Sequence, residues 1–224
     1  MVKVCDKATS LLEEISILAD KAGTNNLKIM AVTKNRSVDL IEEARIAGFT
    51  LFGENKVQEF LSKEEYFSTK ELEVHLIGHL QTNKVKQAVG KFSIIQSVDS
   101  INVATAIDKE ASKKNIIQDI LLEVNIGREE NKYGFLIENI YEALCEISLL
   151  KNIHLCGLMT IPPITESNEA RRYFCMMKSL FIDITTKKID NVSMNILSMG
   201  MSSDYKEAIM EGSNMVRLGT AIFG

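Results

Sequence analysis

Short apolar runs and longer amphipathic runs alternate along most of the chain. The apolar runs are rich in β-branched residues, and this pattern predicts strands at residues 27–33, 50–53, 73–77, 92–98, 116–126, 153–160, 194–198 and 215–218. The runs between them have helical periodicity, which predicts helices at residues 38–47, 56–63, 82–89, 100–114, 136–150, 166–187 and 204–210. One more helix is predicted over residues 6–22, because Leu11, Ile15 and Leu18 share a face.

The order of these elements predicts the fold class. Regular alternation of strands and helices indicates parallel strands joined by right-handed crossovers, and eight such units favour a closed (β/α)8 barrel. An open doubly wound sheet is the alternative, but that fold usually has a glycine-rich phosphate turn after its first strand, and Thr33–Arg36 contains no glycine. We therefore predict an α/β protein with one domain, a TIM barrel over residues 27–224 preceded by an N-terminal helix within residues 1–26.

Composition narrows the class of protein. The 224 residues are 46% hydrophobic and 25% charged, with a net charge of −4, which suits a soluble globular protein. This charge argues against a nucleic-acid binder, because phosphate contacts need a dense cationic face. No apolar run reaches the ~18–20 residues of a membrane helix, and the first residues lack the apolar core of a signal peptide. A cytoplasmic location without membrane association is expected.

The cysteines and histidines predict neither a disulfide framework nor a metal site. Four cysteines lie far apart in the sequence without paired spacing, at Cys5, Cys145, Cys156 and Cys175. His75 and His79 have HxxxH spacing, but they fall in a predicted strand and the turn after it, and no third ligand is evident.

Lys34 is the first candidate for chemistry. In a barrel, functional residues collect where strands end and βα loops begin, and Lys34 directly follows the predicted strand at residues 27–33, which contains the apolar segment Ile29–Val32. A partly desolvated lysine there either pairs with an anion or becomes partly neutral, and a neutral amine can form a Schiff base with an aldehyde. The alternative is a solvated lysine at a strand end.

The last two strands supply the other candidates. Ser198–Ser202 and Gly219–Thr220 follow them, at the place where barrels often bind phosphate through backbone N–H groups. The alternative is that these residues only form tight turns. Arg217 interrupts the apolar run of the last strand, and a buried arginine needs an acceptor. That acceptor is either a ligand or a structural ion-pair partner such as Glu54 or Glu123.

Seven segments carry a resemblance to a known family. They occur in family order from residue 31 to the last residue, and several are too specific to arise by chance: Ala31–Lys34, Phe52–Glu59, His75–Lys84, Lys132–Gly134, Gly157–Pro162, Leu197–Ser202 and Val216–Gly224. On these residues the sequence resembles the pyridoxal phosphate homeostasis proteins, also called the alanine racemase N-terminal-domain-like family.

The resemblance implies a single-domain barrel that binds pyridoxal 5′-phosphate. By position, Lys34 matches the lysine that holds this cofactor as an internal aldimine, and Arg217 matches the arginine that faces the pyridine nitrogen. Asn55 matches a polar residue at the mouth of the cofactor site.

The resemblance also assigns the phosphate site. Ser202, Gly219 and Thr220 match its residues, with the backbone of Met201 beside them. No residue is assigned a catalytic role, and no metal is implied.

Three functions stay open at this point. The resemblance implies a carrier or buffer of pyridoxal phosphate, monomeric or weakly dimeric, that has no established catalysis and can pass its cofactor to apo forms of pyridoxal-phosphate enzymes. The alternative is a single-domain amino-acid racemase, although a two-base racemase needs a second acid or base that alanine racemases take from an added domain. A third class is a sugar-phosphate enzyme that uses Lys34 as a Schiff-base lysine without a cofactor.

Overall fold

The computed structural model describes residues 4–24 and 26–224. Parallel strands form a closed barrel in sequence order, and β8 pairs back onto β1. The strands are β1 (Lys28–Val32), β2 (Leu51–Glu54), β3 (Glu73–Leu76), β4 (Ile94–Val98), β5 (Gln118–Val124), β6 (Ile153–Thr160), β7 (Val192–Met201) and β8 (Met215–Leu218). The predicted TIM barrel is confirmed, and the open-sheet alternative is wrong.

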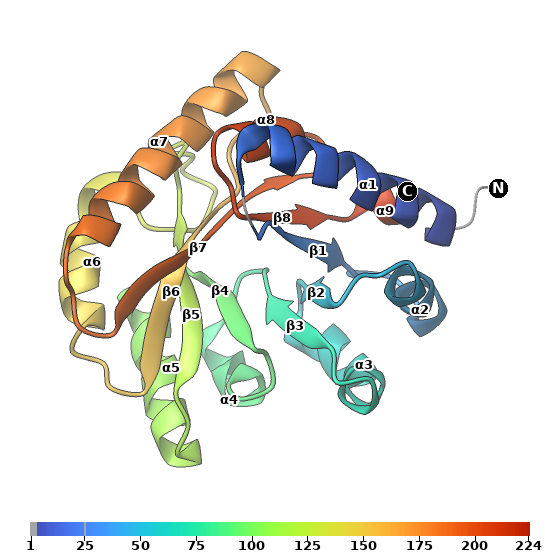
Figure 1. Ribbon diagram of the computed structural model, residues 1–224. Coiled ribbons are helices and arrows are strands. Elements are labelled where there is room, and N and C mark those ends of the chain that lie inside the picture. Colours follow the sequence, from blue (N-terminus) through green and yellow to red (C-terminus); the bar gives the residue numbers. More distant parts are fainter. Residues whose placement is uncertain (1–3, 25) are drawn as a thin grey trace.

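Helices cover the outside of the strands (Figure 1). They are α2 (Val38–Ile46), α3 (Val57–Thr69), α4 (Val85–Ala88), α5 (Ile101–Lys114), α6 (Ile140–Ile147), α7 (Ser167–Thr186), α8 (Tyr205–Met210) and α9 (Thr220–Phe223), with 3₁₀ turns at Thr82–Lys84 and Ile137–Asn139. No helix in the described ranges is long and apolar enough to cross a membrane.

The predicted N-terminal helix is α1 (Val4–Ala22). It buries Ala8, Leu11, Ile15 and Ala19 and packs against α2, α8 and α9, on the outside of the barrel (Figure 1). Residues 1–3 and 25 of the predicted N-terminal segment lie outside the described residues. The assignment of all 224 residues to one domain stays a prediction.

Two apolar layers hold the barrel together. The outer layer lies between the strands and the helices, and the inner layer fills the barrel itself with Met30, Val32, Leu51, Ile77, Ile94, Leu121, Cys156, Met159, Ile196 and Met215. In β5, Ile120 and Leu122 face the outer layer while Leu121 faces the inner one. Because both faces of a parallel strand are buried, its sequence is a continuous apolar run.

The structure departs from the predicted elements at β7, which runs over Val192–Met201 instead of residues 194–198, and most clearly at two helices. Helix α3 continues to Thr69 instead of ending near residue 63, because buried Phe67 stacks on Phe60 with ring centroids 5.8 Å apart. The short helix α9 was not predicted, and it begins at Thr220, directly after the last strand.

Candidate functional site

A cavity of about 280 Å³ opens at the carboxyl ends of the strands. All seven residues predicted from the sequence line it: Lys34, Asn55, Met201, Ser202, Arg217, Gly219 and Thr220. Val32, Ile77, Ile161 and Ser203 complete the lining. The cavity therefore has apolar walls and a few polar groups, which is the usual composition of a small-molecule site.

Lys34 stands two residues beyond the end of β1, and its side chain is exposed at the cavity. The residue before it, Thr33, continues the strand pairing by donating its N–H to Gly53 O at 3.0 Å. The residue after it, Asn35, has a φ of 56°, a left-handed conformation that asparagine tolerates better than most residues. The chain thus turns sharply at Lys34, and both neighbours of this lysine are constrained.

A buried charge cluster below this turn holds it in place. Lys63 of α3 is 7% exposed, and its Nζ donates to Thr33 O at 2.9 Å, Glu54 Oε1 at 2.9 Å and Glu59 Oε1 at 2.8 Å. The same Glu59 oxygen accepts the N–H of Asn35 at 2.5 Å. One lysine and its two carboxylates therefore fix the backbone on both sides of Lys34.

Glu54 is the most deeply buried member of this cluster, with 0% exposure. Burial raises its pKa, whereas hydrogen bonds from Lys63 and Thr33 oppose the rise. Its Oε1 accepts the Thr33 hydroxyl at 2.7 Å. Glu54 is not the ion-pair partner of Arg217 that the sequence left as an alternative, because Glu54 pairs with Lys63 at 2.9 Å.

Ser202 organises the part of the cavity wall that follows β7 and β8. Its Oγ accepts the N–H groups of Gly219 and Ala221, each at 3.1 Å. A hydroxyl has two lone pairs and one proton, so this oxygen keeps its O–H free to donate to a further acceptor. Thr220, exposed at the same place, carries a second hydroxyl.

Gly219 leaves space next to these donors. A Cβ built on Gly219 would meet only Val32 within 4 Å, at 3.7 Å and 3.8 Å. Packing therefore does not require glycine here, and a side chain at this position would project beside Val32, which lines the cavity.

Met201 lines the cavity, but its backbone N–H is already used. It donates to Asp204 Oδ1 at 2.6 Å. The register of β7 against β8 shifts just before Met201, at Gly200, whose φ is 96° and whose Cβ would stand 2.5 Å from that of Ala208. The structure thus places Met201 where the sequence predicted it, with a neighbouring carboxylate bound to its amide.

Arg217 is 3% exposed in β8 and reaches the cavity. Its Nη1 donates to Ser198 Oγ at 2.7 Å and its Nη2 to Thr160 O at 2.8 Å. Burial lowers its pKa to about 10, and the charges of Glu123 and Asp204 oppose this. No carboxylate in the described part of the chain lies within ion-pair distance of this guanidinium, so the alternative of a structural ion pair with Glu123 is not observed either.

A chain of buried hydrogen bonds extends from Arg217 across the barrel. Ser198 donates its hydroxyl to Gln96 Oε1 at 2.7 Å, and Gln96 Nε2 lies 2.7 Å from His75 Nδ1. His75 Nε2 lies 2.8 Å from Glu73 Oε1. Ser198, Gln96 and His75 are each 0% exposed.

This hydrogen-bond chain has one direction. The amide Nε2 of Gln96 can only donate, so Nδ1 of His75 accepts this hydrogen bond. Nε2 of His75 therefore carries the ring proton and donates a hydrogen bond to Glu73. Burial lowers the pKa of His75, which keeps the ring neutral. Every donor therefore points from the guanidinium of Arg217 toward the carboxylate of Glu73, and such aligned bonds strengthen one another.

His75 and His79 do not share a site. His75 belongs to the hydrogen-bond chain inside the barrel, whereas His79 Nδ1 bonds to Asp99 Oδ2 at 2.7 Å. The ring of His79 stacks on Tyr133 with centroids 3.6 Å apart. The HxxxH spacing therefore does not correspond to a pair of ligands.

Sequence reasoning missed the residues behind the cavity. Lys63 lies in a run of charged residues that is typical of a solvated helix face, and Gln96 is a single polar residue in an apolar strand. Ser198 was expected in the phosphate segment Ser198–Ser202, but it is fully buried and accepts a hydrogen bond from Arg217. A polar residue inside an otherwise apolar strand was the one sequence feature that indicated this hydrogen-bond chain.

Comparisons with known proteins show similarity over nearly the whole chain. The family model described as "Alanine racemase, N-terminal domain" matches residues 8–224. The "Pyridoxal phosphate homeostasis protein" of Aquifex aeolicus is 43% identical over 227 residues, covering 100% of this chain and 98% of that protein. The protein of the same name from Haemophilus influenzae is 36% identical, covering 94% and 90%.

Solved structures extend the likeness. PipY of Synechococcus elongatus, solved with pyridoxal phosphate bound, superposes with a TM-score of 0.81 at 30% identity, covering 92% of this chain and 100% of that chain. An alanine racemase of Clostridium difficile superposes with a TM-score of 0.71 at 17% identity, and this chain covers 55% of it. That second likeness shows the shared fold alone.

Proposed function

Because the chain belongs to the alanine racemase N-terminal domain family, we propose that it binds pyridoxal phosphate in the cavity described above. Its role is pyridoxal phosphate homeostasis, in which it holds the cofactor and releases it. The observation that carries the proposal is the convergence of an amine, a buried guanidinium and a hydroxyl–amide cluster on one cavity of about 280 Å³.

The residues fit the cofactor group by group. Bound pyridoxal phosphate supplies an aldehyde that condenses with a primary amine, and Lys34 is the lysine that lines the cavity. The free hydroxyl protons of Ser202 and Thr220 suit the phosphate oxygens, and the missing side chain of Gly219 leaves room for them. Val32 and Ile161 supply apolar walls for a flat ring.

Arg217 supports a role in which the protein binds the cofactor without using it for catalysis. With a pKa of about 10, its guanidinium stays protonated at neutral pH and can only donate a hydrogen bond. A ring nitrogen that accepts this bond remains unprotonated, so the ring withdraws electrons weakly. Enzymes that use the full electron sink place a carboxylate at that nitrogen.

The racemase alternative requires a second catalytic group besides Lys34. Two-base racemisation needs a second acid or base, worth about 10²–10⁴ in rate, on the face of the cofactor away from Lys34. The relatives that this chain covers over 98% and 90% of their length are named pyridoxal phosphate homeostasis proteins, not racemases. We therefore infer a protein without efficient catalysis.

The finer parts of the proposal concern the cellular setting. We infer a cytoplasmic monomer or weak dimer that hands pyridoxal phosphate to apo forms of enzymes that use it. These inferences follow from the homeostasis role of the named relatives.

Two measurements on the cofactor-loaded protein test the role. Mixing it with an excess of an apo-enzyme should restore that enzyme's activity faster than the loaded protein loses cofactor to buffer alone. Incubation with single-enantiomer amino acids should produce no racemisation in the ordinary enzyme range of about 1–10³ per second. Turnover in that range would contradict the carrier role and support the racemase alternative.

A further inference from the structure

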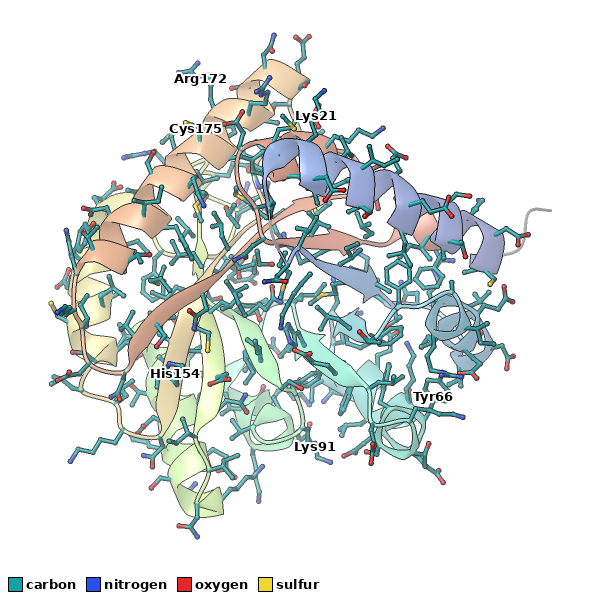
Figure 2. All side chains as sticks on the ribbon, in the orientation of Figure 1. Lys21, Tyr66, Lys91, His154, Arg172 and Cys175 are labelled. Carbon is teal, nitrogen blue, oxygen red and sulfur yellow. The ribbon has the colours of Figure 1, made fainter. Side chains whose placement is uncertain are left out.

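Three potential metal ligands meet at the end of the barrel opposite the cavity. They are Asp119 near the start of β5 and His154 and Cys156 near the start of β6; His154 is labelled in Figure 2. His154 and Cys156 are two residues apart, so both side chains lie on the same face of β6. Asp119 is the direct cross-strand partner of His154.

A β-bulge brings Cys156 to the other two residues. The register of β5 against β6 passes from Ile120–Leu155 to Leu121–Gly157, which leaves Cys156 without a partner on β5. The distortion depends on Gly157, because a Cβ there would lie 1.8 Å from Ile196 O. Bulges re-aim side chains and recur beside functional sites, and this one directs the thiol toward the imidazole.

The distances approach those of a metal site. His154 Nδ1 lies 3.0 Å from Asp119 Oδ1 and 3.3 Å from Cys156 Sγ, and all three atoms lie within 4.8 Å of one another. In a tetrahedral zinc site with bonds of about 2.0–2.3 Å, the ligand atoms lie about 3.4–3.6 Å apart. The two distances from His154 Nδ1 therefore differ from those of a zinc site by a few tenths of an ångström.

The surroundings complete the site. The other ring nitrogen, Nε2 of His154, lies 3.0 Å from Ser193 Oγ on β7, and metal-bound histidines usually bond their second nitrogen to such a partner. The side chains of Asp119 and His154 are 44% and 34% exposed, so a fourth position faces solvent. Without a metal, burial and the charge of Asp119 raise the pKa of the Cys156 thiol to about 12, so binding of the ion releases the thiol proton.

We propose that Asp119, His154 and Cys156 form a zinc-binding site with three protein ligands and one position open to solvent. Imidazole and thiolate select zinc and similar transition metals over Mg²⁺ and Ca²⁺, which prefer sets of oxygen ligands. The ion ties β5 to β6, and through Ser193 to β7, at the end of the barrel away from Lys34. The site is independent of cofactor binding.

Cobalt titration of the chelator-treated full-length protein tests the proposal. One equivalent of Co²⁺ should give a thiolate-to-cobalt charge-transfer band and the d–d bands of four-coordinate cobalt, both in difference spectra against the metal-free protein. Zn²⁺ should abolish these bands by displacing Co²⁺. Cys156→Ser should lose the charge-transfer band, whereas Cys175→Ser, at an exposed cysteine of α7, should keep it.

Two further variants test the site even if Cys156→Ser does not fold. Ser193→Ala should retain the charge-transfer band and weaken Zn²⁺ affinity by about 10–100-fold. His154→Gln should abolish stoichiometric Zn²⁺ binding in calorimetry. The proposal is overturned if the wild-type protein shows no saturable binding, or if the band persists in Cys156→Ser. Either result would mean that the three side chains form only a hydrogen-bonded cluster.

Discussion

Gln96→Met breaks the hydrogen-bond chain behind Arg217 at its centre. Methionine nearly keeps the volume of glutamine, but it removes the acceptor of the Ser198 hydroxyl and the donor to His75 Nδ1. Both groups are 0% exposed, and each stranded buried group costs about 1–3 kcal/mol. The free energy of unfolding should therefore fall by about 2–6 kcal/mol in urea denaturation, out of a typical 5–15 kcal/mol.

Cofactor binding should weaken as well, because Ser198 no longer fixes the guanidinium. The largest expected loss of cofactor affinity corresponds to the hydrogen bond that Arg217 donates to the cofactor ring. A hydrogen bond from a charged donor is worth about 1.5–3 kcal/mol, or about 10–150-fold in affinity. Arg217→Gln should show this full loss, and Gln96→Met a part of it, together with a shifted absorbance spectrum of the bound cofactor.

A matched control separates positioning from general destabilisation. Gln118 on β5 is 3% exposed and donates to Phe92 O at 3.1 Å, outside the hydrogen-bond chain. Gln118→Met should lose comparable stability and leave the cofactor spectrum unchanged. The double variant Gln96→Met/Arg217→Gln should bind no more weakly than Arg217→Gln alone. Additive losses of affinity would refute the argument that Gln96 acts through Arg217.

Three other predictions concern the phosphate end, the Lys34 turn and pH. Ser202→Ala/Thr220→Ala should weaken retention of pyridoxal phosphate far more than binding of pyridoxal, and equal losses in parallel titrations would place the phosphate elsewhere. Lys63→Met should cost about 3–5 kcal/mol in denaturation, because it leaves buried Glu54 unpaired; a cost below about 1 kcal/mol would argue against the cluster's role. Burial and the charge of Asp99 raise the pKa of Glu123 from 4.5 to about 7. Because the folded state binds the carboxyl proton of Glu123 more tightly than the unfolded state, the contribution of Glu123 to stability falls as pH rises from about 4.5 to about 7. Glu123→Gln should therefore stabilise the protein by up to about 3 kcal/mol at pH values above about 7 and little below about 4.5, and a pH-independent effect in denaturation would contradict this.

The fold and the cavity lining could be predicted because both follow from local pattern. Alternating apolar and amphipathic runs specify the parallel barrel, and the barrel specifies where strands end. Lys34 and Gly219 stand directly after the first and the last predicted strands, so their places at the mouth follow from topology alone. The end of α3 was predicted too early because the charged run after Phe60 conceals buried Phe67.

The polar groups inside the protein could not be predicted in the same way. Both faces of a parallel strand are buried, so the pattern does not say which face of β4 carries Gln96. Lys63 looks like any surface lysine until Glu54 is placed beside it. Asp119 and His154 are 35 residues apart, and only the pairing of β5 with β6 brings them together, which is why ligand spacing in the sequence gave no sign of them.

The central claim is that Lys34 holds pyridoxal phosphate in the cavity at the carboxyl ends of the strands. Borohydride reduction of the loaded protein, followed by proteolysis and peptide mass analysis, tests it most directly. The pyridoxyl adduct should lie on the peptide that contains Lys34, and Lys34→Arg, which keeps the charge but cannot condense with the aldehyde, should abolish it. A stable adduct on another lysine, with Lys34 unmodified, would contradict the account.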